Sequence, residues 1–300
     1  MMSRALTIII LLGTLIHAVG CQQSPGGAGI GEVVQVGTTK PSLFGVPEEY
    51  RTLHVDLEKC FDAPVSFSAQ PDGAALGTQL EQGNIPYAIL TAKEFAEISN
   101  PRTVTPLATA INGMGRPSRK AHIVVKAKSH LKTIKDCGGK RFAFGKYKDL
   151  LTDYAARAAL QSAGIPLDKL LPELLPPPFA MEGRLYVQND VPAKIVLDLT
   201  VNAGVVDEVV FANLPKSGGN PITGPSQDQF EIVGETLEIP ETVVVAGPAA
   251  DPQQSARLKA FLLNEAKSNA QLCKQMGIQG FAEPDAGAYE AVKKLLPKSR

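Results

Sequence analysis

The sequence contains no tryptophan, and aromatic residues make up only 6% of it. This scarcity weakens any interpretation as a sugar-binding protein that stacks its ligand on indole rings. Net charge is also lacking, since 30 basic residues balance 30 acidic ones and no long run carries a single sign. A nucleic-acid-binding role is therefore disfavoured, because such a role needs a basic surface.

Apolar runs long enough to span a membrane are lacking too. The run at residues 5–19 has about fifteen residues, which is short for a spanning helix and typical of a signal peptide. A basic start at residues 1–4 precedes it, and the small residues 18–20 lead directly to Cys21. This order looks like a bacterial lipoprotein signal, which is cut before a cysteine that then carries lipid.

We therefore expect residues 1–20 to be a signal peptide and Cys21 to be the site of lipid attachment. Residues 21–31 are rich in glycine, serine and proline, and we expect them to form a flexible tether. The protein would then work on the periplasmic or cell-surface face of a bacterial membrane, to which its lipid anchors it. The alternative is a plain secretory signal or short membrane anchor in which Cys21 is incidental.

Cysteine is scarce, and three residues remain once Cys21 is assigned to lipid. Cys60, Cys137 and Cys273 are an odd number for an oxidising compartment, so one disulfide with a free thiol and three buried thiols both stay open. If a disulfide forms, we consider Cys60 with Cys273, each in a predicted helix. No CxxC motif or cysteine–histidine cluster is present, so we expect neither a metal nor another cofactor.

The 300 residues suffice for one bilobed domain or two small ones. In the first part, short apolar segments at residues 32–37, 65–69 and 87–90 are typical of strands. Residues 48–61 and 73–81, which lie between them, have helical spacing. This β-α-β-α-β alternation predicts an α/β fold with a mostly parallel, doubly wound sheet, whose ligands bind beyond the carboxyl ends of the strands.

A second α/β series begins near residue 119, and we therefore expect two doubly wound lobes. One lobe is predicted to combine residues 32–118 with 225–300, and the other to cover 119–224. Two crossings would join them, near Pro117 and between Gly218 and Gly234, so that a ligand cleft lies between the lobes. The further predicted elements are strands at 121–126, 141–144 and 206–211, a helix at 150–163, extended structure at 232–245, and helices at 251–270 and 286–296.

Several segments of this second part resemble the phosphate/phosphite/phosphonate class of periplasmic solute-binding proteins that serve ABC transporters. They are KAKSHLKTIKDCGGKRFAFG at residues 126–145, DYAARAALQSAGIP at 153–166, the approach to Gly204-Val205-Val206-Asp207, and IVGETLEIPETVVVAG at 232–247. The resemblance covers nearly all of residues 32–296. It implies the type II periplasmic-binding-protein fold, two lobes joined by a two-crossing hinge.

The resemblance also implies a function. A small oxyanion, phosphonate- or phosphate-like, would enter the cleft, and the lobes would close on it before delivery to an ABC transporter permease. Backbone N–H groups at helix N-termini and hydroxyl groups would hold the anion. We expect a monomer that binds its ligand without catalysis, because no nucleophile elbow, P-loop or HExxH motif is present.

The sequence departs from the family at two places. Where relatives have a Ser/Thr-Ser-Gly loop, this chain has residues 146–152, KYKDLLT, and where they have a Gly-x-x-Asp motif it has Pro86. These losses favour the alternative that a degenerate binding fold serves as a sensor or partner-binding scaffold without transport. The Pro-rich segment at residues 171–179 is interpreted as a rigid surface loop, with partner docking as the other option.

The candidate ligand-binding residues follow from strand ends and from the family pattern. Several have a plainer interpretation: the threonines after the first strand as a helix-entry turn, the lysines as solvated loop charges, Asp190 as a helix N-cap, and Asp207 as a hinge or surface carboxylate. Tyr87 is expected in the core. The candidates are Thr38, Thr39, Thr91, Lys146, Tyr147, Thr152, Asp190 and Asp207.

Overall fold

The computed structural model describes residues 33–297 apart from 44, 99, 172–178, 182–183, 187–189, 199 and 221–223. Residues 32–300 form one compact unit, separate from the first 31 residues. The expected signal peptide, Cys21 and the tether lie outside the described residues, as does most of the Pro-rich segment. In the described part of the chain, no helix has both the length and the apolar character needed to cross a membrane.

The first lobe contains a six-stranded mixed sheet in the order β14-β4-β13-β3-β1-β2. β1 is parallel to β2 and β3, whereas β13 is antiparallel to β3 and β4 because it belongs to the part of the chain that returns from the second lobe. The strands are β1 Val34–Thr38, β2 Val65–Ala69, β3 Tyr87–Leu90, β4 Thr105–Ile111, β13 Val243–Ala246 and β14 Gly280–Ala282.

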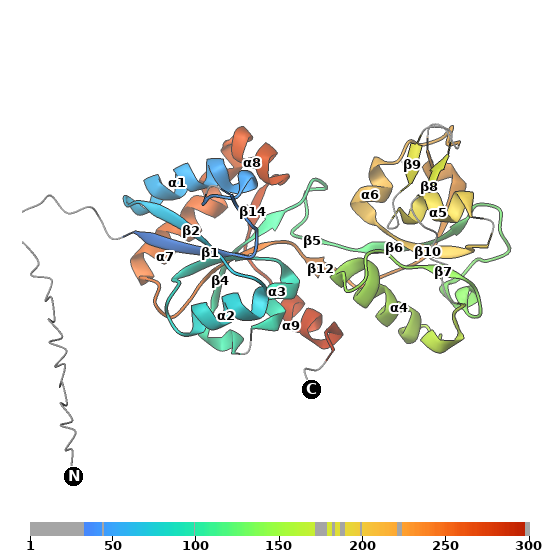
Figure 1. Ribbon diagram of the computed structural model, residues 1–300, viewed down its shortest axis with the longest axis horizontal. Coiled ribbons are helices and arrows are strands. Elements are labelled where there is room, and N and C mark those ends of the chain that lie inside the picture. The colour runs from blue at the N-terminus through green and yellow to red at the C-terminus, as the bar shows by residue number, and fades with distance from the viewer. Residues whose placement is uncertain are drawn as a thin grey trace, which may run out of the picture. The chain divides into compact units, whose positions relative to one another are not determined.

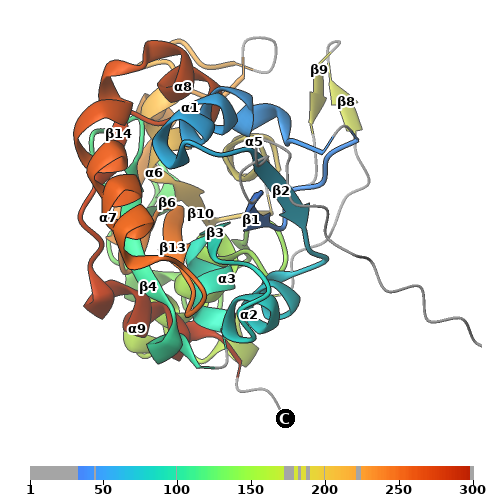
Figure 2. The ribbon, with the colours of Figure 1, turned by 90° about the vertical axis from the view of Figure 1, so that its left-hand side faces the viewer.

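Helices cover both faces of this sheet, with α1, α7 and α8 on one face and α2, α3 and α9 on the other (Figures 1 and 2). Alternation along β3 explains this: Tyr87 and Ile89 pack on the first face, and Ala88 and Leu90 on the second. Tyr87 is thus a core residue, as predicted. The helices are α1 Arg51–Phe61 with η1 Glu48–Tyr50 before it, α2 Gly73–Glu81, α3 Ala92–Glu97, η2 Pro101–Thr103, α7 Pro252–Ala260, η7 Phe261–Glu265, η8 Ala266–Ser268, α8 Ala270–Met276 and α9 Ala286–Leu295.

The second lobe contains a four-stranded sheet in the order β11-β6-β10-β7, and its helices include a continuous η4–α4 segment. The strands are β6 Ala121–Lys126, β7 Phe142–Ala143, β10 Ala203–Asp207 and β11 Phe230–Glu235, beside a hairpin of β8 Phe179–Met181 and β9 Arg184–Tyr186. The helices are η3 Ile134–Cys137, η4 Leu150–Ala155, α4 Ala156–Ser162, η5 Leu167–Lys169, α5 Val191–Leu197, α6 Glu208–Asn213 and η6 Gln227–Gln229.

Two crossings join the lobes, β5 Ser118–Arg119 and β12 Ile239–Pro240, which pair with each other as antiparallel strands. Ion pairs reinforce this hinge: the Arg119 guanidinium lies 3.1 Å from Asp207 Oδ2 and 3.4 Å from Glu241 Oε1. Arg116 forms a further ion pair with Glu208. Side chains from both crossings and from the second lobe therefore meet at one place.

Two predictions about this region were wrong. Residues 206–211 do not form one strand, because β10 ends at Asp207, whose carboxylate accepts a hydrogen bond from the Val209 N–H and starts α6. The second crossing also comes later than the boundary expected at residue 225, since β11 still pairs with β6 in the second lobe.

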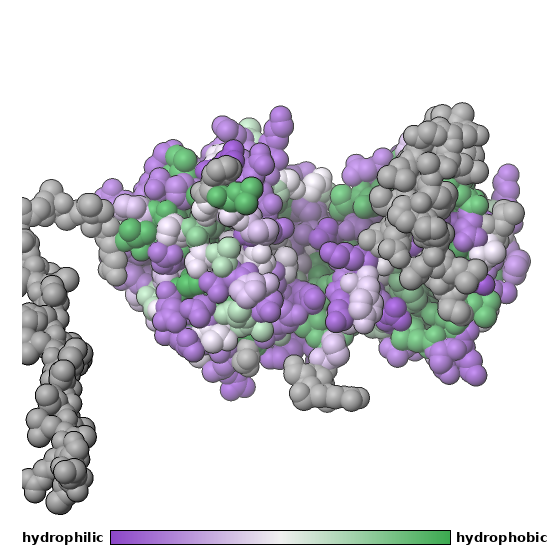
Figure 3. All heavy atoms as spheres, viewed as in Figure 1, coloured by the Kyte–Doolittle hydropathy of each residue, from purple (hydrophilic) through white to green (hydrophobic). Residues whose placement is uncertain are grey.

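The three cysteines after the first 31 residues are free thiols, so the structure contains no bond between Cys60 and Cys273. Cys137 is fully buried, and burial raises the pKa of its thiol to about 11. On the face shown in Figure 3, hydrophilic and hydrophobic residues are interspersed, as on most globular proteins.

Candidate functional site

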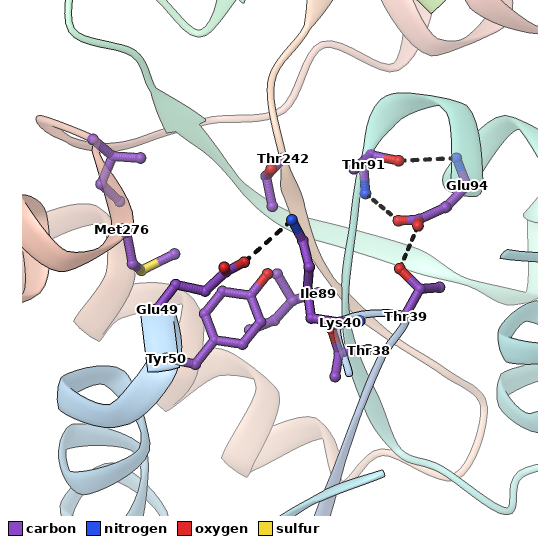
Figure 4. A pocket seen from close by; sticks show the side chains of 11 residues that line it. Thr38, Thr39, Lys40, Glu49, Tyr50, Ile89, Thr91, Glu94, Thr242 and Met276 are labelled. Carbon is purple, nitrogen blue, oxygen red and sulfur yellow. Dashed lines mark hydrogen bonds and ion pairs between the residues drawn. The ribbon is translucent and has the colours of Figure 1, made fainter. Parts of the chain in front are cut away.

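A cavity of about 150 Å³ lies at the carboxyl ends of β1 and β3 in the first lobe. Thr38 is the last residue of β1, Thr39 follows it, and Thr91 follows β3, so the structure places all three predicted residues at this edge. Figure 4 shows them with their neighbours. The complete lining is Thr38, Thr39, Lys40, Glu49, Tyr50, Ile89, Thr91, Glu94, Thr242, Met276 and Ile278.

Glu94 binds two of these predicted residues. Its Oε2 accepts a hydrogen bond from the Thr91 N–H at 2.7 Å, and its Oε1 accepts one from the Thr39 hydroxyl (Figure 4). Thr91 Oγ1 in turn accepts from the Glu94 N–H at 3.3 Å, which completes a capping box at the start of α3. The Thr-x-x-Glu spacing at 91–94 is the sequence signal for this contact.

Acidic groups dominate this cavity. Glu49 forms an ion pair with Lys40 at 3.3 Å, and Glu94 is engaged as described, so two carboxylates face one ammonium group. Tyr50 is buried beside them, and its burial raises the pKa of the phenol, with a further rise from the Glu49 carboxylate. The phenol is therefore neutral under ordinary conditions.

A larger cavity of about 340 Å³ opens between the lobes and includes the hinge. Thr91 belongs to both cavities, and the candidate residues Lys146 and Tyr147 of the second lobe line this one. We call it the interlobe cleft. Its lining is Thr91, Ala92 and Lys93 from the first lobe, Arg119 and residues 239–242 from the hinge region, and residues 146–151 from the second lobe.

The second-lobe wall is a rigidly supported turn at Lys146–Asp149, closed by a hydrogen bond from the Asp149 N–H to the Lys146 carbonyl at 3.0 Å. Lys148 has a φ of 63°, a left-handed conformation that costs a non-glycine residue about 1–2 kcal/mol. Its N–H donates to the buried carboxylate of Asp153 at 2.8 Å, and Arg157 pairs with that carboxylate. The turn therefore holds its side chains toward the cleft from a fixed base.

The Asp149 carboxylate lies at the start of the η4–α4 segment, where the sequence predicts that the bound anion accepts hydrogen bonds. Its Oδ1 accepts hydrogen bonds from the Leu151 N–H at 3.1 Å and from both the N–H and the hydroxyl of Thr152 at 2.7 Å. Thr152 does not line the interlobe cleft, so the structure does not bring it to the predicted contact. Two of the N–H groups at this helix start therefore already have the protein's own carboxylate as their acceptor.

The two predicted aspartates are both helix caps. Asp190 accepts from the Ala193 N–H at 3.1 Å at the start of α5 and lines none of the described cavities. Asp207 caps α6 and pairs with Arg119, so it lies behind a cleft residue instead of on the cleft surface. For both, the plainer interpretation of the sequence describes the observed contacts.

A third cavity of about 240 Å³ adjoins the hinge and shares Arg119, Glu241 and Thr242 with the interlobe cleft. Thr242 lines all three cavities, so they meet around the point where the chain re-enters the first lobe. Sequence reasoning missed Lys93, Arg119 and Thr242. Lys93 lies two residues after the predicted Thr91, whereas Arg119 and Thr242 carry no motif and become visible only through the fold.

Basic groups prevail in the interlobe cleft, which is lined by four basic and two acidic side chains. Arg119 is paired with carboxylates, and Lys93 lies 3.8 Å from Glu97. Lys146 and Lys148, in contrast, have no ion-pair partner among the described residues. The second-lobe wall is therefore the part of the cleft best suited to attract an anion.

Comparison with known proteins gives a family. Residues 46–289 match the family model described as ABC transporter, phosphonate, periplasmic substrate-binding protein. No curated protein matches the sequence.

Solved structures share the fold at low sequence identity. XAC2383 from Xanthomonas citri bound to chloride ion is 16% identical, with a TM-score of 0.62 over 88% of this chain and 95% of that chain. PhnD1 from Prochlorococcus marinus in complex with methylphosphonate is 15% identical, with a TM-score of 0.55 over 88% of this chain and 96% of that one. A binding-protein component of an ABC phosphonate transporter from Pseudomonas aeruginosa is 12% identical, with a TM-score of 0.53 over 88% and 85%. The two-lobe type II fold predicted from the sequence is thereby confirmed.

The cap at Asp149 yields a stability prediction. Asp149→Ala removes three accepted hydrogen bonds and should lower the free energy of unfolding by about 0.5–2 kcal/mol, whereas Asp149→Asn, which can still cap, should lose less. Urea unfolding followed by circular dichroism measures both. Asp168→Ala is the control, since that exposed residue caps no helix, and it should change the value by less than about 0.5 kcal/mol. If Asp149→Ala and the control lowered the free energy of unfolding by the same amount, the capping role of Asp149 would be contradicted.

Proposed function

The chain belongs to the family of periplasmic substrate-binding proteins of phosphonate ABC transporters, and on that premise we propose that it captures a small phosphonate- or phosphate-like oxyanion in the interlobe cleft. Proteins of this family bind small ligands and deliver them to membrane permeases. They are binding proteins, not enzymes. The observation that carries the proposal is the pair of lysines on the turn of the second lobe.

Lys146 and Lys148 suit an anion because each is exposed at the cleft and neither pairs with a described carboxylate. An ammonium group that is already neutralised gains little from a second anion, whereas an unpaired one can form a charge-assisted hydrogen bond. Thr91 supplies a hydroxyl across the cleft. Its oxygen accepts from the Glu94 N–H, so its own proton stays available to donate to a ligand oxygen.

We expect the two lobes to close on the ligand, because Thr91 and the two lysines belong to different lobes. A ligand that contacts Thr91 and Lys146 together can do so only when both walls are near, so it favours the closed arrangement by its extra contacts there. The crossings β5 and β12 are the segments about which the lobes would move. We propose that a single copy of the chain performs this cycle and presents the loaded form to a permease.

Lipid anchoring at Cys21 is the second part of the proposal. The signal-like residues 1–20 and the tether at 21–31 support it, and the compact unit begins only after the tether. If residues 21–31 behave as the flexible chain that their composition predicts, they would span roughly 15–20 Å on average and leave the binding domain free to turn above a membrane.

One observation favours the alternative of a sensor or partner-binding scaffold without transport. The helix N-termini beside the cleft are capped by the chain's own Glu94 and Asp149, so fewer donors remain for a transported oxyanion. A scaffold of this kind needs no small ligand. Ligand binding therefore separates the two proposals directly.

A thermal-shift measurement on residues 22–300 tests ligand capture, because a ligand that binds only the folded form raises the unfolding midpoint. Methylphosphonate or phosphate should raise it, and Lys146→Gln with Lys148→Gln should weaken the affinity at least about tenfold through loss of charge-assisted hydrogen bonds. Lys169→Gln, an exposed lysine of the same lobe outside the cleft, is the matched control and should change nothing. No shift with any oxyanion would reject ligand capture and support the scaffold.

Lipid attachment is tested in cells. In a bacterial host, the wild-type protein should fractionate with membranes and incorporate labelled palmitate, whereas Cys21→Ser should do neither. Cys60→Ser is the control, because that residue lies within the folded unit. Palmitate label that persists in Cys21→Ser would show that this cysteine is not the attachment site.

A further inference from the structure

Tyr147 stands out in the interlobe cleft because 75% of its surface is exposed. It is the one aromatic side chain among the exposed large hydrophobic residues of the described chain. Lys148 Nζ lies 5.4 Å from the centre of its ring, and the turn beneath is fixed by the Asp149 and Asp153 contacts. A rigid backbone thus presents the Tyr147 ring to solvent at the cleft. The ring therefore loses little conformational entropy when a ligand packs on it.

Apolar side chains also line the cleft that Tyr147 faces. Leu150, Leu151 and Ile239 line the same cleft and are each less than 10% exposed, so their side chains form a closed floor. Pro240 lies on the hinge side of the cleft and Ala92 at its first-lobe wall. Charged and hydroxyl side chains make up the rest of the lining, and a cavity of about 340 Å³ lies within the range of about 300–1,000 Å³ that holds organic ligands.

An inorganic oxyanion would find little in this cleft to replace its water. Asp149 already uses the Leu151 and Thr152 N–H groups and the Thr152 hydroxyl, and Glu94 uses the Thr91 N–H. The ammonium groups of Lys146 and Lys148 would remain as the main unpaired donors, beside the Thr91 hydroxyl, and flexible point charges offset the loss of hydration less well than a fixed set of N–H groups. An anion that also buries an apolar body gains free energy from a second source.

We propose that the ligand is an organic oxyanion with a planar or apolar body, whose anionic group lies at Lys146 and Lys148 and whose body stacks on Tyr147. This inference rests on the proposed function, since it concerns the ligand of the same cleft. It places ring-bearing phosphonates or similar organic anions above phosphate and methylphosphonate in affinity.

Calorimetric titration of residues 22–300 with three probes tests the inference: inorganic phosphate, methylphosphonate and phenylphosphonate. The last two share one phosphonate head group and differ in the body, so a titration at a pH where both are dianions compares a methyl group with a phenyl ring. Phenylphosphonate should bind about tenfold more tightly than methylphosphonate, because its ring forms an aromatic contact and buries apolar surface.

Variants at Tyr147 identify the surface responsible. Tyr147→Ala should remove most of the tenfold advantage of phenylphosphonate over methylphosphonate, whereas Tyr147→Phe should retain the advantage. The side chain is exposed, so both variants are expected to fold, and circular dichroism checks this.

The outcomes separate the two proposals. If methylphosphonate binds as tightly as phenylphosphonate, or if Tyr147→Ala leaves the ring's advantage intact, the inference about the ligand's body is overturned while oxyanion capture stands. If none of the three anions binds, the proposed function itself fails, and this inference with it.

Discussion

Antiparallel pairing of β5 with β12 is the contact on which the rest of the structure depends. Since the chain leaves the first lobe through one strand and returns through the other, these two strands are the covalent connection between the lobes, beside the contact of α9 with η4. Residues far apart in sequence, such as Thr91, Lys146 and Thr242, line one cleft for this reason. The ion pairs of Arg119 with Asp207 and Glu241 lie at the same point, where they connect both crossings to the second lobe.

Two carboxylates of the protein itself accept hydrogen bonds that a bound oxyanion could otherwise accept at this cleft. Glu94 and Asp149 occupy helix N-termini on opposite sides of it, and each contributes to stability by satisfying N–H groups that would otherwise lack a partner. The same contacts withdraw those donors from a ligand. In our proposal, recognition then falls to the lysines and the exposed Tyr147 of the second-lobe turn, and this is why we expect an organic anion to be favoured over an inorganic one.

Much of the fold could be predicted from the sequence, because strand and helix periodicity is strong in residues 65–90 and the segment order matches a known family. The positions of Thr38, Thr39 and Thr91 followed from where strands end. The boundary within residues 203–213 could not be predicted, since Val205, Val206, Val209 and Val210 suit a strand on either side of Asp207 and only its cap separates β10 from α6. Contacts between residues far apart in the sequence could not be predicted either: Glu94 and Thr39 are separated by 55 positions, and Arg119 and Asp207 by 88.

The central claim is that one ligand contacts both lobes. Small-angle X-ray scattering of residues 22–300 tests it directly, with and without phenylphosphonate at a concentration that saturates the calorimetric titration. The account predicts a smaller radius of gyration in the bound form, because a ligand held by Lys146 and Thr91 together draws the walls of the cleft closer. An unchanged radius at full saturation would show that the ligand binds to one lobe alone and would contradict the account.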